Sequence, residues 1–136
     1  MALPNGAGGY QLGDGNLNET TLGYGPTPAT YTANATAALT VANLEGGIIV
    51  YTQTNANNLQ LPLVDGVGGV DDRISSAKVG STFDFYVIST STGVATVTVN
   101  TGWTLVGSGA TPASGIGAQF RARKTADGAW TLYRLA

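Results

Sequence analysis

The chain has 136 residues, a formal net charge of −2 and only 10% charged residues, while 43% of its residues are hydrophobic. This length and hydrophobic content are typical of one folded domain, and the low charge excludes a basic face for nucleic-acid phosphates or anionic lipid. The sequence contains neither histidine nor cysteine. The usual general base, the thiolate nucleophile, zinc thiolates and disulfides are therefore missing. We expect no enzyme, no metal and no other cofactor.

Three features of the sequence bear on the compartment. No signal peptide is visible, and no apolar run approaches the roughly 20 residues that span a membrane. A chain without cysteine also suits a reducing environment. We expect synthesis in the cytoplasm, with neither nucleic acid nor membrane as a partner.

Residues 1–35 are rich in glycine and asparagine, show no hydrophobic periodicity and include the prolines of GPTPA. Tyrosine and leucine nevertheless recur every few residues, unlike in a Gly/Ser linker. We expect an extended N-terminal arm that orders against a partner, with a solvated flexible tail as the alternative. The anchors expected in this arm are Tyr10, Leu12, Leu17, Leu22 and Tyr24.

Residues 36–136 consist of short β-rich runs between turn residues. Strands are expected in IIVYTQT (48–54), NLQLPL (58–63), STFDFYVIS (81–89) and VATVTVN (94–100), with Pro62 marking an edge strand. The segment 42–47 reads as a turn. The segment 70–78 is the one expected helix, with Val70, Ile74 and Ala77 on its apolar face. This pattern predicts an all-β fold: an antiparallel β-sandwich of jelly-roll type with one short helix, preceded by the arm.

The C-terminal run FRARKTADGAWTLYRLA (120–136) predicts a β-hairpin. A two-residue turn would bury arginine beside Trp130, so we expect a three-residue loop ending in a left-handed Gly128. Phe120, Ala122, Trp130 and Leu132 then share the buried face, and Arg121, Arg123, Thr131 and Tyr133 share the other. Lys124 is expected to join this outward basic cluster. Arg121, Arg123 and Tyr133 are candidate partner-binding residues, and a solvated strand face is the alternative.

Other motifs give weaker signals. The segments GAGGYQ, GVGGVD and GSGATP lack the third glycine of a dinucleotide-binding loop, so they read as turns. DGNLNE resembles the start of a calcium loop, but Glu19 and Gly25 occupy the positions that need glycine and glutamate. An oxygen site on Asp14, Asn16 and Glu19 remains the alternative to an exposed Asx-turn. We interpret Asp71 and Asp72 as acidic residues of the kind that are favoured in the first turn of a helix. Trp103 and Trp130 are expected in the core, with sugar stacking as the alternative.

The segments PNGAGGYQLGDGN, LEGGIIVYT, AKVGSTFDFYVIS and FRARKTADGAWTLYRLA resemble small virion proteins of tailed bacteriophages. In these capsid decoration, or cement, proteins an N-terminal arm precedes a compact β domain. The resemblance implies a homotrimer on the capsid exterior that clamps neighbouring subunits of the major capsid protein. It brings no catalytic or ligand-binding residues. A fibre or host-surface domain that binds glycans is the alternative function.

Overall fold

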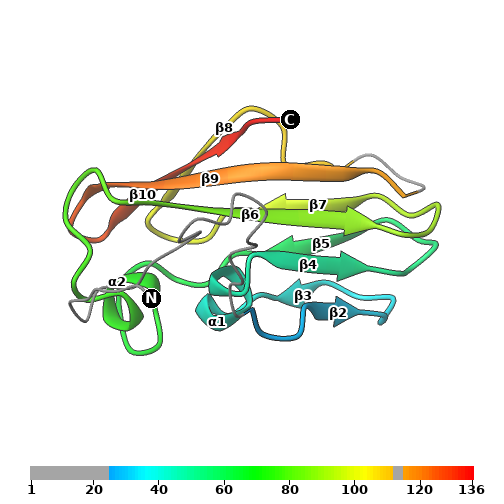
Figure 1. Ribbon diagram of the computed structural model, residues 1–136, viewed down its shortest axis with the longest axis horizontal. Coiled ribbons are helices and arrows are strands. Elements are labelled where there is room, and N and C mark those ends of the chain that lie inside the picture. The colour runs from blue at the N-terminus through cyan, green and yellow to red at the C-terminus, as the bar shows by residue number, and fades with distance from the viewer. Residues whose placement is uncertain (1–24, 112–114) are drawn as a thin grey trace, which may run out of the picture.

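The computed structural model describes residues 25–111 and 115–136, and this part of the chain is a mostly β domain with two short helices (Figure 1). Among the described residues, no helix is long and apolar enough to cross a membrane. The strands are β2 (Ala29–Tyr31), β3 (Ala37–Ala38), β4 (Ile48–Tyr51), β5 (Asn57–Gln60), β6 (Thr82–Ser89), β7 (Ala95–Thr98), β8 (Trp103–Val106), β9 (Gly117–Ala126) and β10 (Ala129–Arg134). The helices are α1 (Val41–Glu45) and α2 (Val70–Arg73).

The strands form a six-stranded sheet in the order β2-β4-β6-β9-β10-β8 and a three-stranded sheet in the order β3-β5-β7. From β2 to β7 the chain visits the two sheets alternately. As a result β2, β4 and β6 are parallel neighbours, and so are β3, β5 and β7. The pairs β2–β3, β4–β5 and β6–β7 therefore stack as three coils, the arrangement of a short parallel β-helix.

The predicted all-β class is confirmed, but the predicted antiparallel pairing is wrong for most neighbours. Only β9 runs antiparallel to the strands beside it, β6 and β10, and β8 is parallel to β10. Short strands separated by turns occur both in antiparallel sandwiches and in β-helices, so the pattern does not give strand direction. The edge-strand prediction from Pro62 is also wrong. β5 is the middle strand of its sheet, and Pro62 comes after the last residue of that strand.

Both helices differ from the sequence expectation. The segment 42–47, predicted as a turn, holds all but the first residue of α1, which begins with a capping box. Thr40 Oγ1 accepts a hydrogen bond from the amide of Asn43 (3.2 Å), and Asn43 Oδ1 accepts one from the amide of Thr40 (2.9 Å). The predicted helix 70–78 ends at Arg73, although its predicted face is correct. Val70 is buried, and Ile74 and Ala77 pack against the core.

Loss of this cap gives the first prediction. Thr40→Ala is expected to lower the free energy of unfolding by about 1 kcal/mol, because the amide of Asn43 loses its acceptor. Thr40→Ser keeps the hydroxyl oxygen and is the matched control, with an expected change of a few tenths of a kcal/mol. Chemical denaturation of the two variants measures the difference. Equal destabilisation by both would show that the cap contributes nothing.

The core lies between the two sheets. Leu59 and Val97 from the three-stranded sheet and Ile49, Phe85 and Val87 from the six-stranded sheet belong to one buried cluster. Trp103 and Trp130 are buried in the same cluster, as predicted, with ring centroids 6.2 Å apart.

The C-terminal hairpin has the predicted facing. Thr131 pairs with Arg123, Leu132 with Ala122 and Tyr133 with Arg121, and Gly128 is left-handed with φ 75°. A β-bulge between Ala129 and Trp130 sets this register. Which side chains of β9 and β10 face the core could therefore be derived from the sequence, because burying arginine costs free energy.

Strand β2 lies within residues 1–35, the range assigned to the arm from the sequence. It pairs with β4, and the Tyr31 hydroxyl donates a hydrogen bond to Asn43 Oδ1 (2.7 Å). The side-chain amide of Gln53 donates through Nε2 to the carbonyl of Thr32 (3.0 Å). The folded domain therefore begins before residue 36.

Candidate functional site

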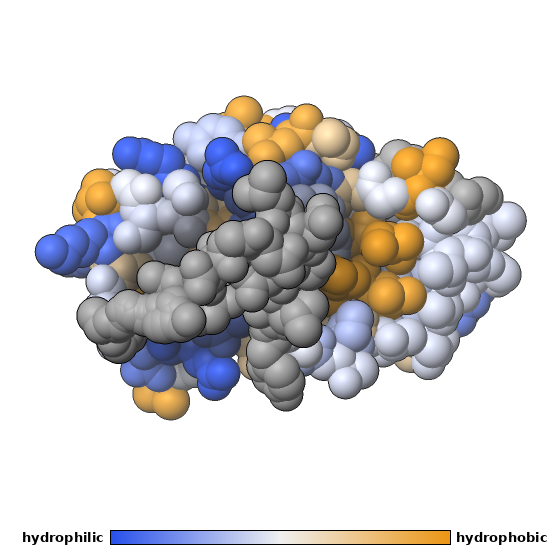
Figure 2. Space-filling model, viewed as in Figure 1, coloured by the Kyte–Doolittle hydropathy of each residue, from blue (hydrophilic) through white to orange (hydrophobic). Residues whose placement is uncertain are grey.

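The six-stranded sheet packs one face on the core, and we call its other face the outer face. Burial alternates along β4, β6, β9 and β10, which places every second residue on this face. The surface in Figure 2 carries apolar patches among polar side chains. The outer-face residues used below are Ile48, Val50, Thr82, Asp84, Tyr86, Ile88, Val106, Gln119, Arg121, Arg123, Thr131 and Tyr133.

One part of the outer face is apolar. Ile48 pairs with Tyr86 and Val50 pairs with Ile88 across β4 and β6, and we call these four residues the apolar patch. Ile48 is 40% exposed and Tyr86 is 43% exposed. Gly117 lies opposite Ile88 in β9 and adds no side chain beside it. The four side chains therefore form a partly exposed apolar surface across β4 and β6.

The other part of the outer face carries the residues predicted from the hairpin. Arg121 forms a bidentate ion pair with Asp84, in which Nε lies 2.7 Å from Oδ1 and Nη2 lies 3.0 Å from Oδ2. The hydrogen bonds from Arg121 lower the pKa of Asp84, and the same pair raises the pKa of Arg121. Tyr133 lies opposite Arg121, and the exposed Arg123 lies between Thr82 and Thr131. The structure thus brings Arg121, Arg123 and Tyr133 together on one accessible face.

The outward placement predicted for Lys124 is wrong. Its position in β9 has the same parity as Phe120 and Ala122, so its side chain points inward and is buried. The ammonium group lies 3.4 Å from Asp71 Oδ1 and 3.2 Å from Asp127 Oδ1, and it donates to the carbonyl of Ala77 (3.1 Å). Strict alternation of inward and outward side chains along β9 predicts this inward direction of Lys124.

Asp71 connects α2 to the hairpin. Its carboxylate accepts hydrogen bonds from Trp130 Nε1 (2.8 Å) and from the amide of Gly128 (2.6 Å). Burial alone would raise the pKa of Asp71. The bonds from Trp130 and Gly128, together with the charge of Lys124, outweigh that effect and lower the pKa. Asp71 therefore has a structural role beyond acidity in the first turn of α2.

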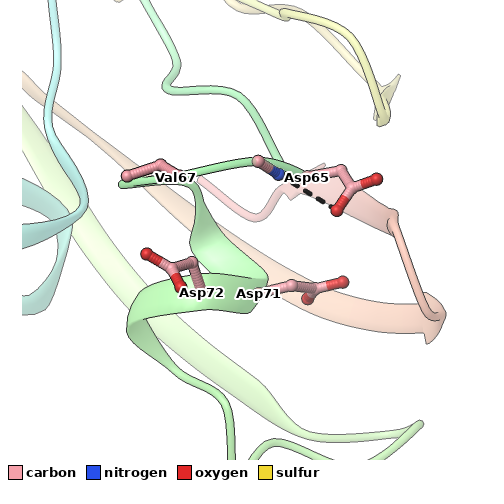
Figure 3. A pocket seen from close by; sticks show the side chains of 5 residues that line it. Asp65, Val67, Asp71 and Asp72 are labelled. Carbon is pink, nitrogen blue, oxygen red and sulfur yellow. Dashed lines mark hydrogen bonds between the residues drawn. The ribbon is translucent and has the colours of Figure 1, made fainter.

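Asp65, Gly66, Val67, Asp71 and Asp72 line an open pocket of about 380 Å³ at the start of α2 (Figure 3). The carboxylates of Asp71 and Asp72 point in opposite directions, and each already accepts a backbone amide, from Gly128 and Gly68. Asp65 accepts the amide of Gly66 (3.0 Å). Within residues 25–111 and 115–136 there is no group of three or more His, Cys, Asp or Glu side chains that could hold a metal ion.

A third surface is formed where the coils turn. Each of the strands β2, β4 and β6 is followed by a turn, at residues 32–36, 52–56 and 90–94. These turns are rich in Thr, Asn, Ser and Gln, and we call them the polar corner. Asn57 donates to Asn34 Oδ1 (3.1 Å) across the first two turns, and the amide of Thr90 donates to the carbonyl of Tyr51 (2.9 Å). The hydroxyls of Thr52 and Thr90 donate to the carbonyls of Tyr31 and Tyr51, so hydroxyl and amide groups are both held in place in neighbouring coils.

The predicted arm anchors Tyr10, Leu12, Leu17, Leu22 and Tyr24 lie outside the described residues, as do Asp14, Asn16 and Glu19. Their roles therefore stay predictions.

In comparisons with known proteins, no family model, no curated protein and no solved structure matches this chain.

Proposed function

We propose that the chain is a non-enzymatic structural protein of a virion, a capsid decoration protein that binds the outer capsid surface and clamps neighbouring major capsid subunits. The observation that supports this proposal best is the outer face. It presents exposed apolar side chains beside Arg121, Arg123 and Tyr133 on strands whose opposite face is packed into the core. Aromatic and arginine side chains are the usual energetic centres of protein interfaces.

The architecture suits such a role. The two sheets enclose one core in a sandwich-like scaffold, and α2 is joined to the hairpin turn through Asp71. A scaffold fixed in this way presents its surface with little loss of conformational entropy on binding. In the proposed assembly the protein acts as a homotrimer on the capsid exterior, and the segment before residue 25 contributes to the clamp.

The test is the binding of the purified chain to capsid particles that lack it, measured by co-sedimentation. We expect saturable binding at a fixed ratio to the major capsid protein. Arg123→Glu combined with Tyr133→Ala is expected to weaken binding at least about tenfold, because an exposed cation and an aromatic contact are lost together. Lys78→Glu makes the same charge reversal outside the outer face and is expected to bind like the unmodified chain. No binding of the unmodified chain would refute the function, and an unaffected double variant would refute this surface.

The polar corner supports a second candidate, a fibre or host-surface domain that binds glycans. Its fixed hydroxyl and amide groups have the chemistry that hydrogen-bonds sugar hydroxyls. Retention of the chain on a glycan array, lost in Gln53→Ala and Asn34→Ala, would favour this candidate over decoration.

A further inference from the structure

We propose that the dipeptide Asp65–Gly66 is a site of spontaneous covalent modification in the folded protein, where a succinimide forms and reopens to isoaspartate. The same dipeptide at Asp127–Gly128 is protected by its hydrogen bonds. The proposal goes beyond the virion role, because it concerns the chemistry of the chain itself and holds with or without a capsid.

An aspartate followed by glycine favours this reaction, because glycine has no side chain to hinder attack by its own amide nitrogen. The amide nitrogen of Gly66 forms a bond to Cγ of Asp65, and its proton leaves with the carboxyl hydroxyl as water. A second water then opens the succinimide ring. Where it attacks the former backbone carbonyl, the main chain runs on through Cβ and Cγ of Asp65, and a free carboxylate remains on Cα. Neither an oxidant nor a cofactor takes part.

The structure holds the two reacting groups of Asp65–Gly66 together. The amide of Gly66 donates a hydrogen bond to Oδ1 of the preceding Asp65 at 3.0 Å (Figure 3). Because Cγ is bonded to Oδ1, the nitrogen lies beside the carbon that it attacks, and such proximity lowers the entropic part of the barrier. In the described part of the chain, no lysine or arginine forms an ion pair that would hold the Asp65 carboxylate elsewhere.

The surroundings of this dipeptide are open to solvent. Asp65, Gly66 and Val67 line the open pocket at the start of α2, and Val67 is fully exposed. A Cβ on Gly66 would meet nothing within 4 Å. Water therefore reaches both carbonyl carbons of the succinimide, and the loop has room for the planar ring.

The dipeptide Asp127–Gly128 is alike in most respects. Both glycines are left-handed, with φ 99° at Gly66 and 75° at Gly128, and the Asp127 side chain is 98% exposed. The difference is the partner of the amide. The amide of Gly128 donates to Asp71 Oδ2 (2.6 Å), and Lys124 Nζ lies 3.2 Å from Asp127 Oδ1. Attack on the Asp127 carboxyl would therefore require both contacts to break.

Isomerisation changes the loop that precedes α2. The amide of Gly69 donates to the carbonyl of Gly66 (3.0 Å), and the amide of Gly68 donates to Asp72 Oδ2 (2.9 Å). Isoaspartate lengthens the main chain by the Cβ methylene just before these bonds. The modified chain therefore presents the exposed Val67 on an altered loop.

The test compares the two dipeptides within one protein. The full-length natural chain is incubated at neutral pH, well below its unfolding temperature, and is then unfolded and digested with chymotrypsin. Electron-transfer fragmentation in the mass spectrometer distinguishes isoaspartate from aspartate in the peptides that contain Asp65 and Asp127. Asp65→Glu is the matched variant, because it keeps the charge while glutamate forms the larger imide ring much more slowly.

We expect isoaspartate to form at residue 65 about tenfold faster than at residue 127, a difference of about 1.4 kcal/mol in activation free energy. In concentrated guanidinium chloride the two rates should become equal, because unfolding removes the hydrogen bonds of both glycine amides. Equal rates in the folded protein, or a faster rate at residue 127, would overturn the proposal. A difference that persists in denaturant would also overturn it, since it would belong to the local sequence rather than to the fold. The same signal in Asp65→Glu would assign the product to another residue. None of these measurements involves capsids, so their failure is distinct from failure of the decoration proposal.

Discussion

Gly93→Ala is expected to destabilise the domain by about 3 kcal/mol, at the upper end of the usual cost of overpacking. Gly93 is buried in the turn between β6 and β7, where the coil stacks on the turn after β4. An added Cβ would lie 2.2 Å from the carbonyl oxygen of Gln53 and 2.5 Å from that of Asn55. Both obstacles are backbone atoms of the neighbouring coil, so no side chain can rotate to make room.

Denaturant unfolding of Gly93→Ala beside Gly25→Ala measures this effect. A Cβ on Gly25 meets nothing within 4 Å, and its φ is not in the left-handed region. We expect the free energy of unfolding of the Gly25 variant to lie within about 0.5 kcal/mol of that of the natural chain. If both variants were equally stable, the coils would not stack as closely as the structure places them.

Asp71→Ala is the second large effect, with an expected loss of about 3 kcal/mol of unfolding free energy. The substitution removes the acceptor for Trp130 Nε1 and for the amide of Gly128, and it takes one of two carboxylates from the buried Lys124. Buried donors without partners and half-broken buried ion pairs are among the costliest single changes. Asp84→Ala breaks an exposed ion pair instead and is expected to cost about 0.5–1 kcal/mol. Equal losses in the two variants would contradict the structural role of Asp71.

The same contacts predict a pH dependence. The pKa of Asp71 is lower in the folded protein than in the unfolded chain, so its stabilising contribution is complete above the unfolded value of about 3.9. The contribution disappears as the pH falls through the lower, folded pKa. The difference in unfolding free energy between the natural chain and Asp71→Ala should therefore be constant near neutral pH and narrow below about pH 4. A difference that grows on acidification would contradict the sign of the shift.

Which face a side chain takes could be predicted from the sequence wherever a strand alternates. Phe85 and Val87 face the core, and the hairpin register follows from the cost of burying Arg121 beside Trp130. Strand direction could not be predicted, because alternation is the same in parallel and antiparallel sheets. Helix α1 could not be predicted from the sequence, because it has only five residues and Asn43 stands where a capping box usually has Glu or Gln.

Half of the candidate surface was predictable. Arg121, Arg123 and Tyr133 share a face by parity alone, whereas the apolar patch depends on β4 lying beside β6, which no local pattern shows. A hint was present in β4 itself, where IIVY is apolar on both faces. Asp71 and Trp130 are 59 residues apart in sequence, so their contact could not be derived without the fold.

Cryo-electron microscopy of virus particles purified from the natural source of this chain tests the decoration proposal most directly. The decoration proposal predicts density for this domain at regular, symmetry-related positions on the outer capsid lattice, in contact with more than one major capsid subunit. Density confined to the tail or fibres, or a capsid that lacks this chain, would contradict it.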